Sequence, residues 1–220
     1  MNRRTFLAAA AALPVLGYLT KYGIAANAAE QAAQAEPILT PLAFWYLRHG
    51  ETDWNAQGLS QGVADIPLNA AGIAQARQAA PTLRDRGILT IVASPLARAR
   101  VTAEIVGESL GLPVLIDPDL REVSVGVQEG KKAPSGMFAD WISGGVIPEG
   151  AETFHAAQRR AVTAVNRSLT HPASVLVVAH GSLFRTLLKS MGMDPNTRTK
   201  NAVPMRCVPP AVGQTAWTVV

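Results

Sequence analysis

Short apolar runs alternate with helix-like stretches along most of this chain, and that alternation restricts its fold more than any other feature. Such an order of strands and helices is typical of a largely parallel sheet with helices on both faces. At 220 residues, the chain is long enough for one domain with a sizeable core. The predicted strands are 42–47, 88–94, 113–116 and 174–180, with an edge strand in the tail at 217–220, and the predicted helices are 69–86, 95–110, 137–142, 152–169 and 182–192.

Local signals place the ends of two of these helices. Ser94 is a good N-cap and Pro95 suits a first helical position, so the second helix is predicted to carry Arg98 in its first turn and to stop at Gly111. In the first helix, Pro81 removes a backbone donor, and we expect a break just before it.

The N-terminal segment has the pattern of an export signal. Arg3 and Arg4 precede an apolar run at 6–19, and the small residues at 26–28 form a cleavage pattern. The paired arginines, with Lys21 after the apolar run, resemble a twin-arginine signal. The alternative is an uncleaved anchor helix, but the run is shorter than the roughly 20 apolar residues that a span needs.

Cleavage after Ala28 divides the chain into a signal peptide at 1–28, a disordered lead-in at 29–41 and a folded domain at 42–220. The signal carries three basic residues and no acid, so its removal takes the formal net charge from +4 to +1. No basic run remains, which argues against nucleic-acid binding, and no stable membrane anchor is expected after cleavage. The predicted location is the periplasm or the exterior. The single cysteine, Cys207, cannot form an internal disulfide.

Two histidines end predicted strands and precede a glycine. His49 and His180 would meet at the same edge of a parallel sheet, because the carboxyl ends of its strands line one crevice. Arg48 and Arg98 would lie at the same rim, and guanidinium groups suit phosphate oxygens. A solvated surface turn is the alternative for each residue taken alone, but the joint placement favours a phosphate site.

This arrangement suits phosphoryl transfer to a histidine. A histidine near two arginines is expected to have a lowered pKa and thus a neutral, nucleophilic ring. The leaving alkoxide needs a proton, and Glu122 is the acid in a comparably placed loop.

The motif "LRHGETDWN" at 47–55 closely resembles the signature of the histidine phosphatase superfamily, in the branch that includes cofactor-dependent phosphoglycerate mutases and many phosphatases. The resemblance continues in order through five more blocks and covers essentially all of 42–188. These blocks are "GLSQGVADIPLNAAGIAQA" at 58–76, "SPLARARVTAEI" at 94–105, "LREVSVGVQEG" at 120–130, "PEGAET" at 148–153 and "VVAHGSLFRTLL" at 177–188.

The resemblance implies a three-layer α/β/α sandwich with a mostly parallel central sheet, and it implies roles for named residues. His49 would be the phosphorylated nucleophile and Glu122 the proton donor, later the base for water. The phosphoryl group would be held by Arg48, Arg98 and His180, and the substrate pocket would include Asn55, Gln61, Gly181 and Ser182. The family needs no metal or other cofactor. The sequence departs from the family at Leu59, where an arginine is common.

The expected reaction is hydrolysis of a small-molecule phosphate ester. Mutases of this branch carry a long insertion between the catalytic acid and the second histidine, whereas only residues 123–179 separate Glu122 from His180 here. Phosphoglycerate mutase-type transfer and a catalytically silent phosphate-binding module stay open as alternatives. A serine hydrolase is disfavoured because "HGSLF" lacks the G-x-S-x-G elbow, and Ser182 is interpreted as a helix cap beside His180. The sequence leaves the oligomeric state open.

Overall fold

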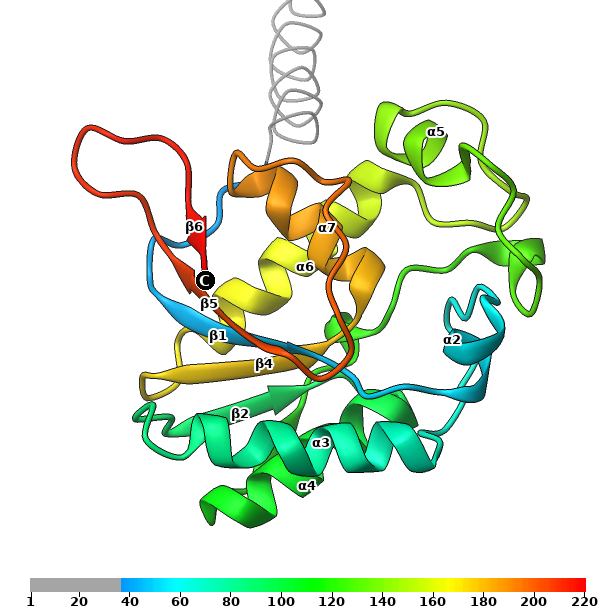
Figure 1. The fold of residues 1–220 in the computed structure, drawn as a ribbon. Coiled ribbons are helices and arrows are strands. Elements are labelled where there is room, and N and C mark those ends of the chain that lie inside the picture. The colour runs from blue at the N-terminus through cyan, green and yellow to red at the C-terminus, as the bar shows by residue number, and fades with distance from the viewer. Residues whose placement is uncertain (1–36) are drawn as a thin grey trace, which may run out of the picture. The chain divides into compact units, whose positions relative to one another are not determined.

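A computed structural model of the protein describes residues 37–220, which form one compact unit (Figure 1). The predicted signal peptide at 1–28 and most of the predicted lead-in lie outside the described residues, so export stays a prediction. Among the residues described, no helix is long and apolar enough to cross a membrane.

The centre of the domain is a sheet of six strands in the order β3-β2-β4-β1-β5-β6. The first four strands in that order pair in parallel, and β5 and β6 extend the sheet with antiparallel pairing. The strands are β1 (Phe44–Arg48), β2 (Thr90–Ala93), β3 (Val114–Ile116), β4 (Val175–Ala179), β5 (Pro204–Val208) and β6 (Thr218–Val219). The short strand predicted in the tail is present as β6 at the edge of the sheet.

Helices cover both faces of the sheet (Figure 1). On one face lie α3 (Ala70–Leu83) and α4 (Ala97–Leu110), and on the other lie α6 (Phe154–Ser168) and α7 (Gly181–Ser190). The remaining turns are α2 (Asp53–Gln57), α5 (Met137–Ser143) and two 3₁₀ turns, η1 (Pro118–Leu120) and η2 (Gly126–Gln128). This is the three-layer α/β/α sandwich with a mostly parallel sheet that the sequence predicts.

The central strand β4 shows why the two helical layers are both needed. All five of its residues are buried. Val175 and Val177 join the core under α6 and α7, while Leu176 and Val178 join the core under α3 and α4. Successive side chains of a strand point to opposite faces, so an uninterrupted apolar strand requires cover on both.

Two predictions about helices are wrong: the break before Pro81 and the N-cap at Ser94. Helix α3 continues through Pro81 to Leu83, because a proline in the last turn removes only one bond from the helix end. Helix α4 begins at Ala97 with Leu96 at its N-cap position, and its first N–H, that of Ala97, donates to the Asp65 carboxylate over 2.6 Å. Ser94 instead lies 2.7 Å from a ring nitrogen of His180.

The folded unit also begins before Leu42. Leu39 is 4% exposed and belongs to the core under α6 and α7. The Thr40 N–H donates to the Asn166 side chain over 2.8 Å, and that side chain donates to the Ile38 carbonyl. A few residues of the predicted lead-in are therefore fixed to α6.

Strand β5 is not among the elements that the sequence predicts. It begins with Pro204, which pairs opposite Leu47 of β1. A proline is tolerated at the first residue of a strand. Because proline is otherwise rare in strands, the sequence pattern does not indicate a strand here.

The loop after β1 packs directly on the N-terminus of α3. Its Gly50 N–H donates to the Thr102 hydroxyl of α4 over 3.0 Å, and the Asn69 side chain caps α3 by accepting from the Gly72 N–H over 2.8 Å. A side chain at Gly72 would collide with the backbone of Glu51. Close approach of two backbones therefore fixes the position of the loop that carries His49.

We predict that Gly72→Ala lowers the free energy of unfolding by about 1–3 kcal/mol, because the added methyl group forces the two backbones apart. Helix propensity alone would raise the free energy of unfolding by up to about 1 kcal/mol, because alanine favours a helix more than glycine does. Urea unfolding measures the difference, with the exposed Ala74→Gly on the same helix as the reference for propensity. A stabilised Gly72→Ala protein would contradict the close packing.

Candidate functional site

The ends of three neighbouring parallel strands meet at one cavity. The His49 N–H donates to the Ala179 carbonyl over 3.0 Å, and the Ser94 N–H donates to the Val178 carbonyl over 3.0 Å. The residues that follow β1, β2 and β4 are therefore level with one another. A cavity of about 590 Å³ opens beside them.

Two arginines face this cavity from β1 and α4. The Arg48 guanidinium donates to the Thr199 carbonyl over 2.7 Å. The Arg98 side chain is fully buried, and its two terminal nitrogens donate to the carbonyls of Ala64 and Gly62 over 2.7 and 2.8 Å. Burial lowers the pKa of both guanidinium groups. Backbone oxygens orient both groups while leaving their charge unneutralised.

His49 is held with one ring nitrogen free. Its side chain is buried, and Nδ1 lies 2.7 Å from the Gly50 carbonyl oxygen. A carbonyl can only accept, so Nδ1 carries the proton and the neutral ring presents an unprotonated Nε2. Burial and then the charges of Arg98 and Arg48 hold the pKa of His49 well below its usual value. The ring is therefore kept neutral, as a nucleophile requires.

His180 lies next to His49, with the two ring centroids 5.3 Å apart. Its Nε2 lies 2.7 Å from the Ser94 hydroxyl, and its backbone exchanges hydrogen bonds with the Tyr46 hydroxyl. Burial, followed by the charge of Arg98, holds the pKa of His180 well below its usual value. His180 is buried behind the cavity and is not among the residues that line it.

Four buried polar atoms at this place have no hydrogen-bond partner among the described residues. They are Arg48 Nε, Arg98 Nε, His180 Nδ1 and Thr199 Oγ1. Buried polar atoms are nearly always paired, because an unpaired one costs about 1–3 kcal/mol. Their gathering at the predicted phosphate site marks it as a place prepared for a polar ligand.

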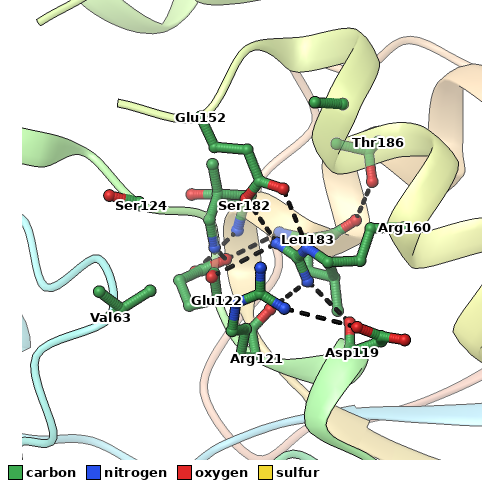
Figure 2. Close-up of polar contacts among 12 residues, drawn as sticks. Val63, Asp119, Arg121, Glu122, Ser124, Glu152, Arg160, Ser182, Leu183 and Thr186 are labelled. Atoms are coloured by element: carbon green, nitrogen blue, oxygen red, sulfur yellow. Dashed lines mark hydrogen bonds and ion pairs between the residues drawn. The ribbon is translucent and has the colours of Figure 1, made fainter. Parts of the chain in front are cut away.

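Glu122 is held by the N-terminus of α7 (Figure 2). Its Oε1 accepts from the N–H groups of Val123 and Leu183, each over 2.9 Å, and its Oε2 accepts from the Ser182 N–H over 3.0 Å. The helix dipole adds a favourable field for a carboxylate at this position. Glu122 is 8% exposed and lines the cavity.

A largely buried ion pair supports the chain that carries Glu122 (Figure 2). Arg160 of α6 makes a bidentate contact with Glu152, at 2.9 and 2.6 Å, and their side chains are 9% and 16% exposed. The same guanidinium donates to the carbonyls of Asp119 and Arg121 over 2.7 and 2.9 Å. Arg160 therefore fixes the backbone immediately before Glu122.

Two side-chain amides line the cavity beyond His49. The Asn55 oxygen accepts from the Thr52 N–H over 3.2 Å, and the Gln61 oxygen accepts from the Thr52 hydroxyl over 3.0 Å. With both oxygens occupied, the amides present their NH₂ groups as donors for a ligand. Asn201 also donates to the Asn55 oxygen, over 3.3 Å.

Gly181 and Ser182 form the first turn of α7 and line the cavity. A Cβ at Gly181 would lie 3.4 Å from Arg48 Nε, an ordinary van der Waals distance, so Gly181 packs directly beside that guanidinium. Ser182 is not the helix cap that the sequence predicts, because His180 occupies the N-cap position. The Ser182 backbone instead contacts Glu122.

Some residues that line the cavity are not among the predicted site residues. Arg185 lies one turn after Ser182 on α7, and Arg198 and Thr199 come from the loop before β5. The spacing of three residues from Ser182 could have indicated Arg185, since residues three apart share a helix face. Nothing in the sequence near Arg198 indicates that its loop returns to His49.

The segment at 137–142 mainly packs against the rest of the domain. Met137 and Trp141 are buried, and Trp141 contacts Phe154 edge to face with ring centroids 4.8 Å apart. Only Phe138 of this helix reaches the cavity. Within the described part of the chain, no three His, Cys, Asp or Glu residues are placed to hold a metal ion.

Comparison with known proteins gives this geometry a family. The profile of the histidine phosphatase superfamily (branch 1) matches residues 44–208. A protein named probable phosphoglycerate mutase GpmB from Yersinia enterocolitica is 36% identical over 171 residues, which cover 72% of this chain and 79% of that protein. The GpmB of Erwinia tasmaniensis is 35% identical over 170 residues, with coverage of 72% and 79%.

Solved structures give the same fold. A mycobacterial glucosyl-3-phosphoglycerate phosphatase in complex with VO3 superposes with a TM-score of 0.69 at 29% identity, covering 80% of this chain and 96% of that one. A phosphoserine phosphatase from Entamoeba histolytica, in complex with 3-phosphoglyceric acid, gives a TM-score of 0.65 at 23% identity, with coverage of 76% and 90%. The chain belongs to the histidine phosphatase superfamily, branch 1.

Proposed function

We propose that this protein is a metal-independent phosphomonoesterase that works through a phosphohistidine on His49. The observation that carries the proposal is the group of buried, unpaired polar atoms around the free nitrogen of His49. A phosphoryl group seated there would accept from the Nε–H groups of Arg48 and Arg98, and its negative charge would be stabilised by both guanidinium groups.

The reaction then has two steps. In the first, His49 Nε2 attacks phosphorus, the bond from phosphorus to the ester oxygen breaks, and protonated Glu122 gives its proton to the leaving oxygen. In the second, Glu122 takes a proton from water as the oxygen of that water attacks phosphorus and the bond to Nε2 breaks. Inorganic phosphate and a free His49 result. The Glu122 Oε2 accepts only one hydrogen bond in the structure, which leaves it a lone pair for the transferred proton.

Phosphoglycerate mutase-type transfer is the second candidate, and the names of the relatives favour it. The phosphatase names of similar structures favour hydrolysis. The segment between Glu122 and His180 also favours hydrolysis, since it spans only residues 123–179 and already contains α5, α6 and β4. A catalytically silent phosphate-binding module is the third candidate. The chain has all five residues to which the resemblance gives a part in the reaction, which argues against a silent module. They are Arg48, His49, Arg98, Glu122 and His180.

We predict that the purified protein hydrolyses p-nitrophenyl phosphate in EDTA and that His49→Ala abolishes turnover. Rapid acid and alkaline quenching with ³²P-labelled substrate should trap an acid-labile, base-stable phosphoenzyme in the parent only. His171→Ala is the matched control, because this histidine is exposed and outside the cavity. Absent turnover and labelling from folded protein would reject the proposal. Phosphoglycerate with a bisphosphate primer would then distinguish a mutase from a binding module.

We predict that Glu122→Gln lowers kcat about 10²- to 10⁴-fold for an alkyl phosphate, because the amide cannot supply a proton to the poor leaving group. The loss should shrink for an aryl phosphate, whose leaving oxygen departs without full protonation. Parallel steady-state kinetics on glycerol phosphate and p-nitrophenyl phosphate measure both values. Equal losses on the two esters would exclude Glu122 as the proton donor.

We predict that Arg160→Met lowers the free energy of unfolding by about 3 kcal/mol, because it leaves the Glu152 carboxylate largely buried and unpaired. It should also lower kcat more for the alkyl than for the aryl ester, since the chain before Glu122 loses its support. Arg100→Met breaks an exposed pair with Glu104 and should cost no more than about 1 kcal/mol. A stability loss without the ester dependence would leave Arg160 a purely structural role.

A further inference from the structure

The cavity holds more positive charge than one phosphoryl group requires. Besides Arg48 and Arg98 beside His49, its lining includes Lys132, Arg185 and Arg198, and Glu122 is its single acidic residue. The proposed chemistry uses the first two arginines and Glu122. The other three cations have no part in it.

Arg185 is the least expected of these cations. It lies on α7 and is 7% exposed, although buried arginines are normally paired with an acid. No hydrogen bond or ion pair joins its guanidinium to another described residue. The guanidinium lies over the Phe138 ring, with its central carbon 4.7 Å from the ring centroid. A cation–π contact alone offsets only a small part of the free-energy cost of burying such a charge.

Arg198 brings a second positive charge to the same cavity, and no hydrogen bond or ion pair joins its side chain to the part of the chain that the structure describes. Burial is the main cause that lowers the pKa of Arg185, and the charge of Arg198 is the next; Glu122 and Asp194 act in the opposite direction. Arg198 also lowers the pKa of Arg48, so its charge acts on both groups. The next residue, Thr199, accepts the hydrogen bond from Arg48. Arg198 thus lines the same cavity as Arg48 and Arg185, and its charge acts on both of them.

We propose that Arg185 and Arg198 bind a second anionic group of the substrate. The inference rests on the proposed phosphatase function and narrows its substrates to phosphate monoesters that also carry a carboxylate or a second phosphate. Guanidinium groups match either anion with paired hydrogen bonds. Phe138, Val123 and Val125 line the cavity as well and supply apolar surface for the carbon skeleton between the two anions.

Equilibrium binding to the His49→Ala protein tests the subsite without requiring turnover. Calorimetry compares 3-phosphoglycerate with glycerol 3-phosphate, which has CH₂OH in place of the carboxylate. It also compares fructose 1,6-bisphosphate with fructose 6-phosphate, which lacks the second phosphate. We expect the doubly anionic member of at least one pair to bind about tenfold or more tightly than its partner. The pair that shows the preference identifies the second anion.

Substitutions in the same background assign the preference to the two arginines. Arg185→Met should bring the ratio of Kd values within a pair close to one, and Arg198→Gln should lower it severalfold. Taking a ratio within each variant cancels losses from altered folding, and the exposed Arg198 provides a variant that leaves the core intact. Arg206→Gln removes an exposed charge of β5 outside the cavity and should leave the ratio unchanged.

A ratio near one for both pairs in the parent, or a preference that survives both substitutions, would overturn the subsite. Hydrolysis of p-nitrophenyl phosphate by the unmodified protein is judged separately. Hydrolysis without a preference would refute the subsite and keep the phosphatase. A preference without hydrolysis would keep the anion subsite on a protein that is no phosphatase.

Discussion

A single positive charge kept out of water connects the parts of this site. The Arg98 guanidinium is fully buried, and its hydrogen bonds to the carbonyls of Gly62 and Ala64 hold the loop after α2 over the first turn of α4. The Arg98 carbonyl accepts from the Thr102 hydroxyl, which accepts in turn from the Gly50 N–H. One arginine and one threonine thus link the predicted phosphate site to the loop that carries His49.

Burying these charges lowers the stability of the folded protein, and other parts of the fold compensate for that loss. Burial disfavours the charged form of Arg48 and Arg98, and burial followed by the charge of these arginines lowers the pKa of His49 and His180 and keeps both rings neutral. Extensive apolar packing on both faces of the sheet offsets this cost. Stability given up locally to prepare a site for its ligand is common in enzymes.

Residues whose role depends on local pattern could be predicted from the sequence. The apolar run of β4 and the histidine that follows it have a clear period and a clear end, and their position in the structure agrees. Ser94 misleads because a serine before a proline suits a helix cap, whereas its hydroxyl contacts a histidine 86 residues away. Arg198 could not be predicted for a related reason, since only the tertiary fold brings its irregular loop to the cavity.

The order of the strands in the sheet has a consequence for how the chain folds. Strand β4 lies between β2 and β1, yet it follows both of them by more than eighty residues in the sequence. Until β4 has been synthesised, β1 and β2 have no shared neighbour, and their edges stay open to wrong partners. Contacts between segments so distant in sequence also form slowly. The two histidines are therefore expected to meet late in folding, because the candidate site is incomplete until the central strand is in place.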